Sequence, residues 1–84
     1  MNQAQALLQE AIFQAIARER RYQDDKYGPK PHTVANFLLI MEAELDEAKR
    51  AWVKSEGDQN ALREILQVIA VGVACLEQHG IVER

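Results

Sequence analysis

The positions of glycine and proline are the feature that most constrains how this chain folds. Gly28 and two prolines close behind it forbid a regular helix in the middle of one polar segment. Gly57 interrupts the chain a second time, and Gly80 follows its most apolar run. The stretches between these breaks carry apolar residues at helical spacing. The sequence therefore predicts an all-α fold, in which residues 1–84 form a single domain of three helices.

The helix ends follow from the residues around each break. The predicted helices are residues 3 to about 21, about 34 to 54 and about 59 to 78. Residues 22–33 form the only long predicted loop, and Thr33 is a candidate cap for the second helix. Asp58 is a candidate cap for the third helix. Because only a short turn joins the last two helices, we expect them to be antiparallel neighbours.

Two features of these helices predict self-association. The second helix carries a regular apolar seam whose residues step by threes and fours: Val34, Leu38, Met41, Leu45, Ala48 and Trp52. From Val68 to Leu76, the third helix is apolar on nearly every face, which is more than one neighbouring pair of helices can cover. A domain of 84 residues also has a small core of its own. We therefore expect an oligomeric helical bundle, either a homodimer or a homotetramer.

The net charge and the cysteine content limit which classes of partner the protein is expected to bind and in which cellular compartment it is expected to occur. The net charge of -3 and the isoelectric point near 5.3 give no long-range attraction to polyanions, so we expect no nucleic-acid polymer as a partner. The single cysteine, Cys75, excludes an internal disulfide and predicts a reducing, cytoplasmic location. The most apolar run, ILQVIAVGVACL, is about half the roughly 20 residues of a membrane span and contains Gln67. We expect a soluble protein without a membrane partner.

Four polar residues interrupt the apolar sides of the second and third helices. On a helical wheel of about 100° per residue, Glu44 is surrounded by apolar neighbours, and Glu47 lies about 60° away, one turn along. On the third helix, Glu64 lies in line with Val68 and other apolar residues, and Gln67 follows three residues later. The two helices thus carry matching polar insertions, and these side chains are predicted to converge.

Converging carboxylates need a compensating charge, because burying each one unpaired costs several kcal/mol. Mg²⁺, or Mn²⁺ in its place, binds oxygen ligands, and glutamates at i and i+3 on facing helices can build such a site in a bundle. The three glutamates are therefore candidate metal ligands. An alternative stays open, in which Glu44 or Glu47 forms an ion pair with Arg50, with Arg63 or with a basic residue of a partner subunit.

Three stretches, ERRYQDDKYG, AELDEA and LREILQVIAVGVACLE, occur in this order along the chain. Together they resemble the MazG-like proteins of the all-α nucleoside triphosphate pyrophosphohydrolase superfamily. Those proteins carry an RQxDxKWG stretch, an ExxGExxxA-type helix and an LREELxQVAAVAxAW-type helix. The resemblance covers roughly residues 18–78 and is most specific in QDDKYG and in the third helix. It implies a helical enzyme that uses Mg²⁺ to hydrolyse nucleoside triphosphates to monophosphates and pyrophosphate.

The resemblance also implies roles for individual residues. The superfamily holds Mg²⁺ with an ExxE motif, which falls on Glu44 and Glu47, and with a later ExxD motif, which falls on Glu64 and Gln67. Glu44, Glu47 and Glu64 are thereby the implied catalytic carboxylates. The last position departs from the motif, because Gln67 is neutral. An amide oxygen still coordinates Mg²⁺, but the site should hold the metal more weakly, which questions catalysis more than fold.

Basic residues near the first break are candidate phosphate-binding residues: Arg20, Arg21, Lys26 and Lys30. Surface pairing and loop solubility are the alternative for each of them. Tyr27 either stacks on a base or packs the loop against the bundle. The sequence supports three hypotheses: a MazG-like nucleoside triphosphate pyrophosphohydrolase, a nucleotide- or metal-binding module without turnover on the same scaffold, and a helical oligomeric interaction protein. It leaves open whether the chain is an enzyme.

Overall fold

The computed structural model describes the backbone of residues 1–84 and every side chain except those of Ser55 and Glu56. Its elements, in chain order, are α1 (Gln3–Tyr27), α2 (Val34–Ala51), the short π-helix η1 (Trp52–Glu56) and α3 (Asp58–His79). The backbone so described contains no strand. The predictions of an all-α fold and of three main helices are therefore confirmed.

α1 is longer than the sequence prediction. The helix continues to Tyr27, because no glycine or proline interrupts it before Gly28, whose φ is 77°. An ion pair of 3.0 Å joins Arg20 and Asp24, one turn apart, and supports the added turns. The predicted loop is therefore wrong in its first half, and the loop that remains is residues 28–33.

One of the two predicted caps is present in the structure. The hydroxyl of Thr33 accepts a hydrogen bond of 3.1 Å from the amide of Asn36 at the start of α2, which confirms the first cap. The prediction for Asp58 is wrong, because this residue already belongs to the first turn of α3 and follows Gly57, whose φ is 63°. Its carboxylate instead accepts a hydrogen bond of 3.1 Å from the indole N–H of Trp52. A hydrogen bond between Trp52, before Gly57, and Asp58, after it, thus stabilises the turn between α2 and α3.

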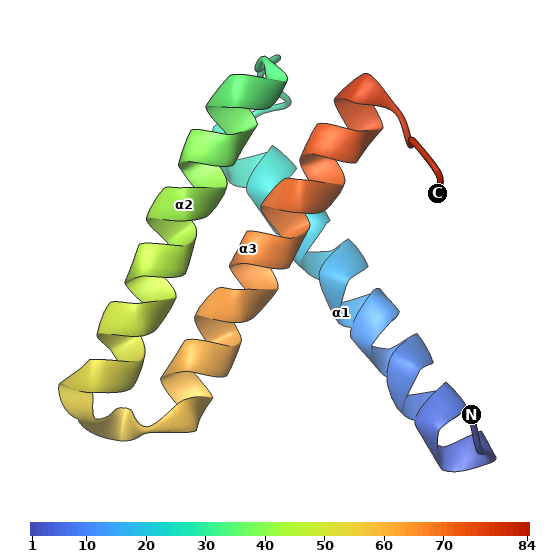
Figure 1. The fold of residues 1–84 in the computed structure, drawn as a ribbon, viewed down its shortest axis with the longest axis vertical. Helices are drawn as coiled ribbons and strands as arrows, with labels where there is room; N and C mark the ends of the chain where they lie inside the picture. Colours follow the sequence, from blue (N-terminus) through green and yellow to red (C-terminus); the bar gives the residue numbers. More distant parts are fainter.

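α2 and α3 form an antiparallel hairpin, as predicted, and α1 packs on α3 (Figure 1). The C-terminal half of α1 crosses α3, while its N-terminal half extends away from the hairpin. The loop 28–33 joins the end of α1 to the start of α2. The last turns of α1, this loop and the C-terminal end of α3 therefore meet at one end of the hairpin.

The hairpin is held by small and apolar side chains. The buried apolar residues among the described side chains are Phe37, Ala48, Ala70 and Val71. At Gly72, an added Cβ would lie 3.3 Å from Cε of Met41, so the methionine packs directly on the backbone of α3. Close approach of α2 and α3 therefore depends on small residues.

The face of α2 that meets α3 differs from the predicted seam. Four seam residues, which we name the apolar stripe, are exposed by 47%, 62%, 45% and 59%: Val34, Leu38, Leu45 and Trp52. The buried arc of α2 is centred roughly 90° away, on Phe37, Glu44 and Ala48. The second helix is apolar on two sides, and the side that its periodicity marks more strongly is the one that α3 leaves uncovered. Glu44 consequently lies in the middle of the buried face and not at its border.

Much further apolar surface is exposed in the single chain. α1 contains no buried residue, and Leu7, Leu8 and Phe13 are all more than half exposed. Within the described chain, α3 alone is long and apolar enough to cross a membrane, with a mean hydropathy of 1.2 over its most apolar window. The core helix of a soluble protein passes the same test, so solubility and a cytoplasmic location stay predictions.

Candidate metal centre

Three glutamates come together on the facing sides of α2 and α3. One carboxylate oxygen each from Glu44, Glu47 and Glu64 lies within 4.8 Å of the others. Glu44 and Glu64 are half-buried, whereas Glu47 is exposed. We name these three residues the acidic cluster. The structure thus brings together three of the four side chains that the sequence predicts to converge.

Two oxygens of the acidic cluster are buried without a hydrogen-bond partner, namely Oε2 of Glu44 and Oε2 of Glu64. Arg63, one of the alternative partners, donates instead to the side chain of Asn60, at 3.4 Å. The ion pairs among the described side chains are Arg20–Asp24, Arg20–Glu77 and Lys49–Asp46. Within this set, the acidic cluster therefore has no basic partner from its own chain. Buried acceptors without a partner are uncommon in folded proteins.

The pKa of Glu44 is raised above its usual value of 4.5. Burial is the largest cause, because it disfavours the charged carboxylate, and repulsion by Glu47 and Glu64 follows. The charge of Glu19 on α1 acts in the same direction. These negative charges lie close enough to destabilise one another, and a bound cation would relieve that repulsion.

An oxygen-binding cation fits the spacing of the acidic cluster. Mg²⁺ holds octahedral ligands at about 2.1 Å, so two ligand oxygens lie about 3 Å apart when adjacent and about 4.2 Å apart when opposite. The cluster oxygens, all within 4.8 Å of one another, reach these separations with small side-chain rotations. The donors are carboxylate oxygens, which suit Mg²⁺ or Mn²⁺ better than softer metals. The residues present therefore fit the predicted metal.

Two further polar residues lie beside the acidic cluster. Gln67, the fourth predicted ligand, is half-buried about one turn beyond Glu64 and lines the adjoining cleft. Glu19 on α1 is also half-buried, lines the same cleft and contributes to the raised pKa of Glu44. Sequence reasoning missed Glu19, although it lies three residues after the half-buried Ile16 on the same helical face. α1 thus adds a fourth carboxylate near the candidate centre.

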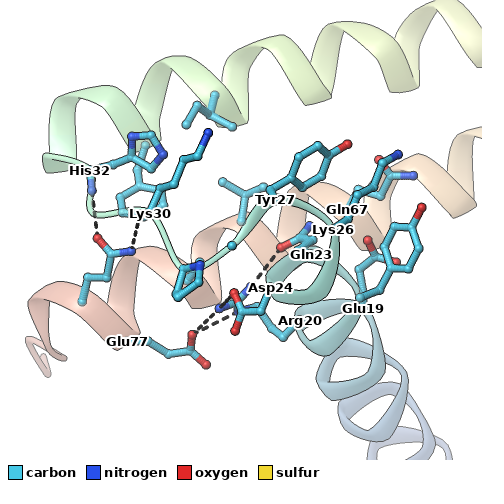
Figure 2. A pocket seen from close by; sticks show the side chains of 18 of the residues that line it. Glu19, Arg20, Gln23, Asp24, Lys26, Tyr27, Lys30, His32, Gln67 and Glu77 are labelled. Carbon is cyan, nitrogen blue, oxygen red and sulfur yellow. Dashed lines mark hydrogen bonds and ion pairs between the residues drawn. The ribbon is translucent and has the colours of Figure 1, made fainter.

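A cleft of about 1170 Å³ extends from Glu44 to the loop 28–33, with walls from α1, α2 and α3. Figure 2 shows Glu19 and Gln67 toward one end of this cleft and His32 toward the other. Ligand sites in proteins typically measure about 300–1,000 Å³. The cleft is therefore large enough for a ligand of nucleotide size.

The two predicted phosphate-binding arginines differ in whether they line the cleft. Arg20 lines the cleft, but its guanidinium is bound to Glu77 at 2.6 Å and to Asp24 at 3.0 Å (Figure 2). Arg21 lines a second hollow, between α1 and α3, which Arg20 also borders. Of the two, only Arg20 borders the cleft, and its charge is already paired.

Lys26 and Lys30, the two predicted phosphate-binding lysines, both line the cleft. The ammonium of Lys26 lies 5.7 Å from the ring centroid of Tyr22 and 5.2 Å from that of Tyr27. Both tyrosines are more than half exposed, so Tyr27 does not pack the loop against the bundle. Neither lysine forms an ion pair with a described carboxylate. Both therefore supply cations to the cleft that no described acidic residue neutralises.

No family model, curated protein or solved structure matches the chain. Its site is therefore interpreted from its own chemistry. The arrangement combines carboxylates at one end of a cleft, the neutral amide of Gln67 beside them and two lysines in the walls. Such a set can hold a hard divalent cation together with an anionic, phosphorylated ligand.

Proposed function

We propose that the chain is a MazG-like, Mg²⁺-dependent nucleoside triphosphate pyrophosphohydrolase. The observation that carries the proposal is the pair of buried oxygens of Glu44 and Glu64 that lack a hydrogen-bond partner, with Glu47 beside them. The sequence resemblance assigns its metal-binding motifs to these same residues. A cleft of nucleotide size with two unpaired lysines gives further support.

The acidic cluster, of which Glu44 lines the cleft, and the other residues of the cleft bind the metal and the substrate respectively. Glu44, Glu47 and Glu64 would hold the metal, with the amide of Gln67 as a neutral neighbour. Mg²⁺, when bound, would neutralise the charge of the triphosphate and polarise the bond that breaks. Lys26 supplies positive charge toward the acidic end of the cleft, whereas Lys30 lies toward the loop end (Figure 2). Arg20, which is paired with Glu77, holds α1 against α3.

A carboxylate of the acidic cluster serves as the general base. It takes the proton of a water whose oxygen attacks the α-phosphorus. The bond from this phosphorus to the bridging oxygen breaks, so pyrophosphate leaves with the electron pair and the monophosphate remains.

We infer that the working form is a homo-oligomer, because a second copy would cover the apolar stripe and part of α1. Leu38→Glu places a charge in the stripe, and it is expected to shift the sedimentation of the protein to that of a single chain. Leu39→Glu is the matched control, since Leu39 is as exposed as Leu38 but lies on another side of α2. Single-chain sedimentation of the unmodified protein would contradict the inference.

The proposed activity is tested by measuring pyrophosphate and monophosphate release from a panel of nucleoside triphosphates with Mg²⁺, with Mn²⁺ and with EDTA. Release is expected with either metal, and EDTA should abolish it. Glu64→Gln removes one cluster charge and should lower kcat by about 100-fold or more. Glu42→Gln is the control, because Glu42 is an exposed carboxylate on the other side of α2.

Both variants should keep the circular dichroism spectrum of the unmodified protein. Absence of release from every triphosphate would contradict the proposed activity. Equal losses in Glu64→Gln and Glu42→Gln would show that the acidic cluster has no special part in it.

The neutral Gln67 favours a second candidate, a module that binds nucleotide and Mg²⁺ without turnover. Thermal stabilisation by Mg²⁺ plus nucleotide, with no pyrophosphate release, would select this candidate. Gln67→Asp restores the acid of the ExxD motif and should then produce measurable hydrolysis. If neither ligand changes the melting temperature, the third hypothesis, a helical oligomeric interaction protein, is the one that survives.

A further inference from the structure

The last turn of α3 holds the loop 28–33 by hydrogen bonds to its backbone. Two prolines remove N–H donors from this loop, and the amide of Lys30 donates to the carbonyl of Gly28 at 2.9 Å. The side chain of Gln78 accepts a bond of 3.0 Å from the amide of His32 and donates one of 2.9 Å to the carbonyl of Lys30. One carboxamide thus pairs with the loop backbone in both directions.

A histidine and a buried ring complete this attachment. Nε2 of His79 donates to the carbonyl oxygen of His32 at 2.7 Å. The rings of His32 and His79 both meet the ring of Phe37 edge to face, with centroids 5.3 Å and 6.1 Å away. We name the bonds of Gln78 and His79 to the loop the clasp. The clasp fixes the loop against α3, and the ring contact of His32 with Phe37 packs the loop on the first turn of α2.

The clasp lies at the end of the cleft away from the acidic cluster. At a rise of 1.5 Å per residue, Gln78 is about 21 Å beyond Glu64 along α3. Lys30 and His32 line this end (Figure 2), and Gln78, which is hydrogen-bonded to both, also lines the cleft. A ligand that binds the acidic cluster through its phosphates therefore directs its other end toward the loop. In a nucleotide, this other end is the sugar and the base.

We propose that Gln78 is a positioning residue for the sugar and base end of a bound nucleotide. It fixes the loop that forms the wall of the cleft there, and it acts on the ligand through this loop and not on the reacting phosphates. The identity of the ligand rests on the proposed function. Loss of Gln78 therefore weakens binding of the nucleoside part, which raises KM and leaves kcat nearly unchanged.

The test compares two ligands that differ in whether they contain a nucleoside. Mg²⁺ with each of ATP, GTP, CTP and UTP probes the whole cleft, whereas Mg²⁺ with inorganic tripolyphosphate probes the phosphate end alone. In Gln78→Ala, which loses two hydrogen bonds, nucleotide affinity is expected to fall about tenfold. Affinity for tripolyphosphate should stay within about twofold, and KM should rise without a matching fall in kcat.

Two further variants sharpen the test. Gln78→Glu can still accept the bond from the amide of His32 but, when ionised, cannot donate to the carbonyl of Lys30, so its nucleotide affinity should be intermediate. Gln59→Ala removes an exposed glutamine from the first turn of the same helix and should leave both affinities unchanged. Amide hydrogen exchange at His32 reports the clasp itself, and it should be faster in Gln78→Ala than in the unmodified protein.

Each outcome separates this proposal from the proposed activity. Equal weakening of nucleotide and tripolyphosphate binding would mean a general effect on the fold, and it would overturn the role of Gln78. Faster exchange at His32 with unchanged nucleotide affinity would also overturn it, while hydrolysis by the unmodified protein would still stand. Selective loss of nucleotide binding in a protein that never hydrolyses its ligand would support the role of Gln78 and reject the activity. Failure of the unmodified protein to bind any nucleotide would reject both.

Discussion

At the loop end of the cleft, three backbone polar groups of Lys30 and His32 are paired by side chains from the last turn of α3. At the acidic end, one oxygen of Glu44 and one of Glu64 have no partner among the described side chains, although both are buried. A buried polar group without a partner costs about 1–3 kcal/mol. The two ends of the cleft thus differ in whether the described residues of the chain supply hydrogen-bond partners for its polar groups.

This difference distinguishes polar groups that stabilise the fold from polar groups that are available to bind a ligand. Polar groups that the chain pairs internally are explained by folding, because they fix the loop and the adjoining helix ends. Buried oxygens that the chain leaves unpaired need a partner from outside, and a divalent cation supplies one. The comparison therefore explains the paired polar groups of the loop end by the order of the loop, and the unpaired oxygens of the acidic end by the binding of a cation.

The largest expected effect concerns the loop end. Phe37→Ala removes the buried ring between His32 and His79 and should lower the free energy of unfolding by about 3 kcal/mol. Leu39→Ala, two residues away and mostly exposed, should change it by less than about 0.5 kcal/mol. Urea denaturation followed by circular dichroism measures both variants. Similar effects of the two would show that the loop end has no structural core.

A smaller effect of opposite sign is expected at the acidic end. Glu44→Gln removes a charge that burial and neighbouring carboxylates disfavour, so without metal the variant should be more stable by about 1 kcal/mol, or about 5 °C in melting temperature. Added Mg²⁺ should stabilise the unmodified protein and leave Glu44→Gln nearly unchanged. Glu42→Gln, measured in parallel, should resemble the unmodified protein. If Glu44→Gln lowered stability without metal, the carboxylate would be a structural group after all.

The smallest effect is a pH dependence without metal. The folded pKa of Glu44 lies above its usual value of 4.5, so just above pH 4.5 the folded state binds more protons than the unfolded state. Stability from this residue therefore falls as the pH rises through the raised pKa, which lowers the melting temperature. The difference between the unmodified protein and Glu44→Gln isolates this contribution. A difference that stays constant from pH 4 to about pH 8 would contradict the raised pKa.

The sequence predicts the helix boundaries well where a single residue, such as a glycine, determines the local backbone conformation. Gly28, Gly57 and Gly80 end or separate helices as expected, and all three have positive φ values. The end of α1 was mispredicted because polar composition suggested a loop, while no residue before Gly28 prevents a helix. The exposed stripe of α2 shows a different limit. Periodicity identifies an apolar side of a helix, but it does not tell whether that side packs within the chain or outside it.

The same distinction applies to the candidate site. The acidic cluster is predictable because Glu44, Glu47 and Glu64 lie on two helices that a short turn makes neighbours. Glu19 and Gln78 were missed because their positions depend on how α1 crosses α3 and how the loop folds back on α3. Neither arrangement is encoded by spacing within one helix. The clasp requires contacts between residues 46 to 48 positions apart in the chain.

The orientation of α2 has a consequence for ligand entry. The apolar stripe and Glu44 lie roughly 90° apart around this helix, so the stripe and the cleft face different directions. A protein bound to the apolar stripe therefore leaves the opening of the cleft exposed to solvent. Oligomerisation through the apolar stripe therefore does not block the entry of small molecules into the cleft or their release from it.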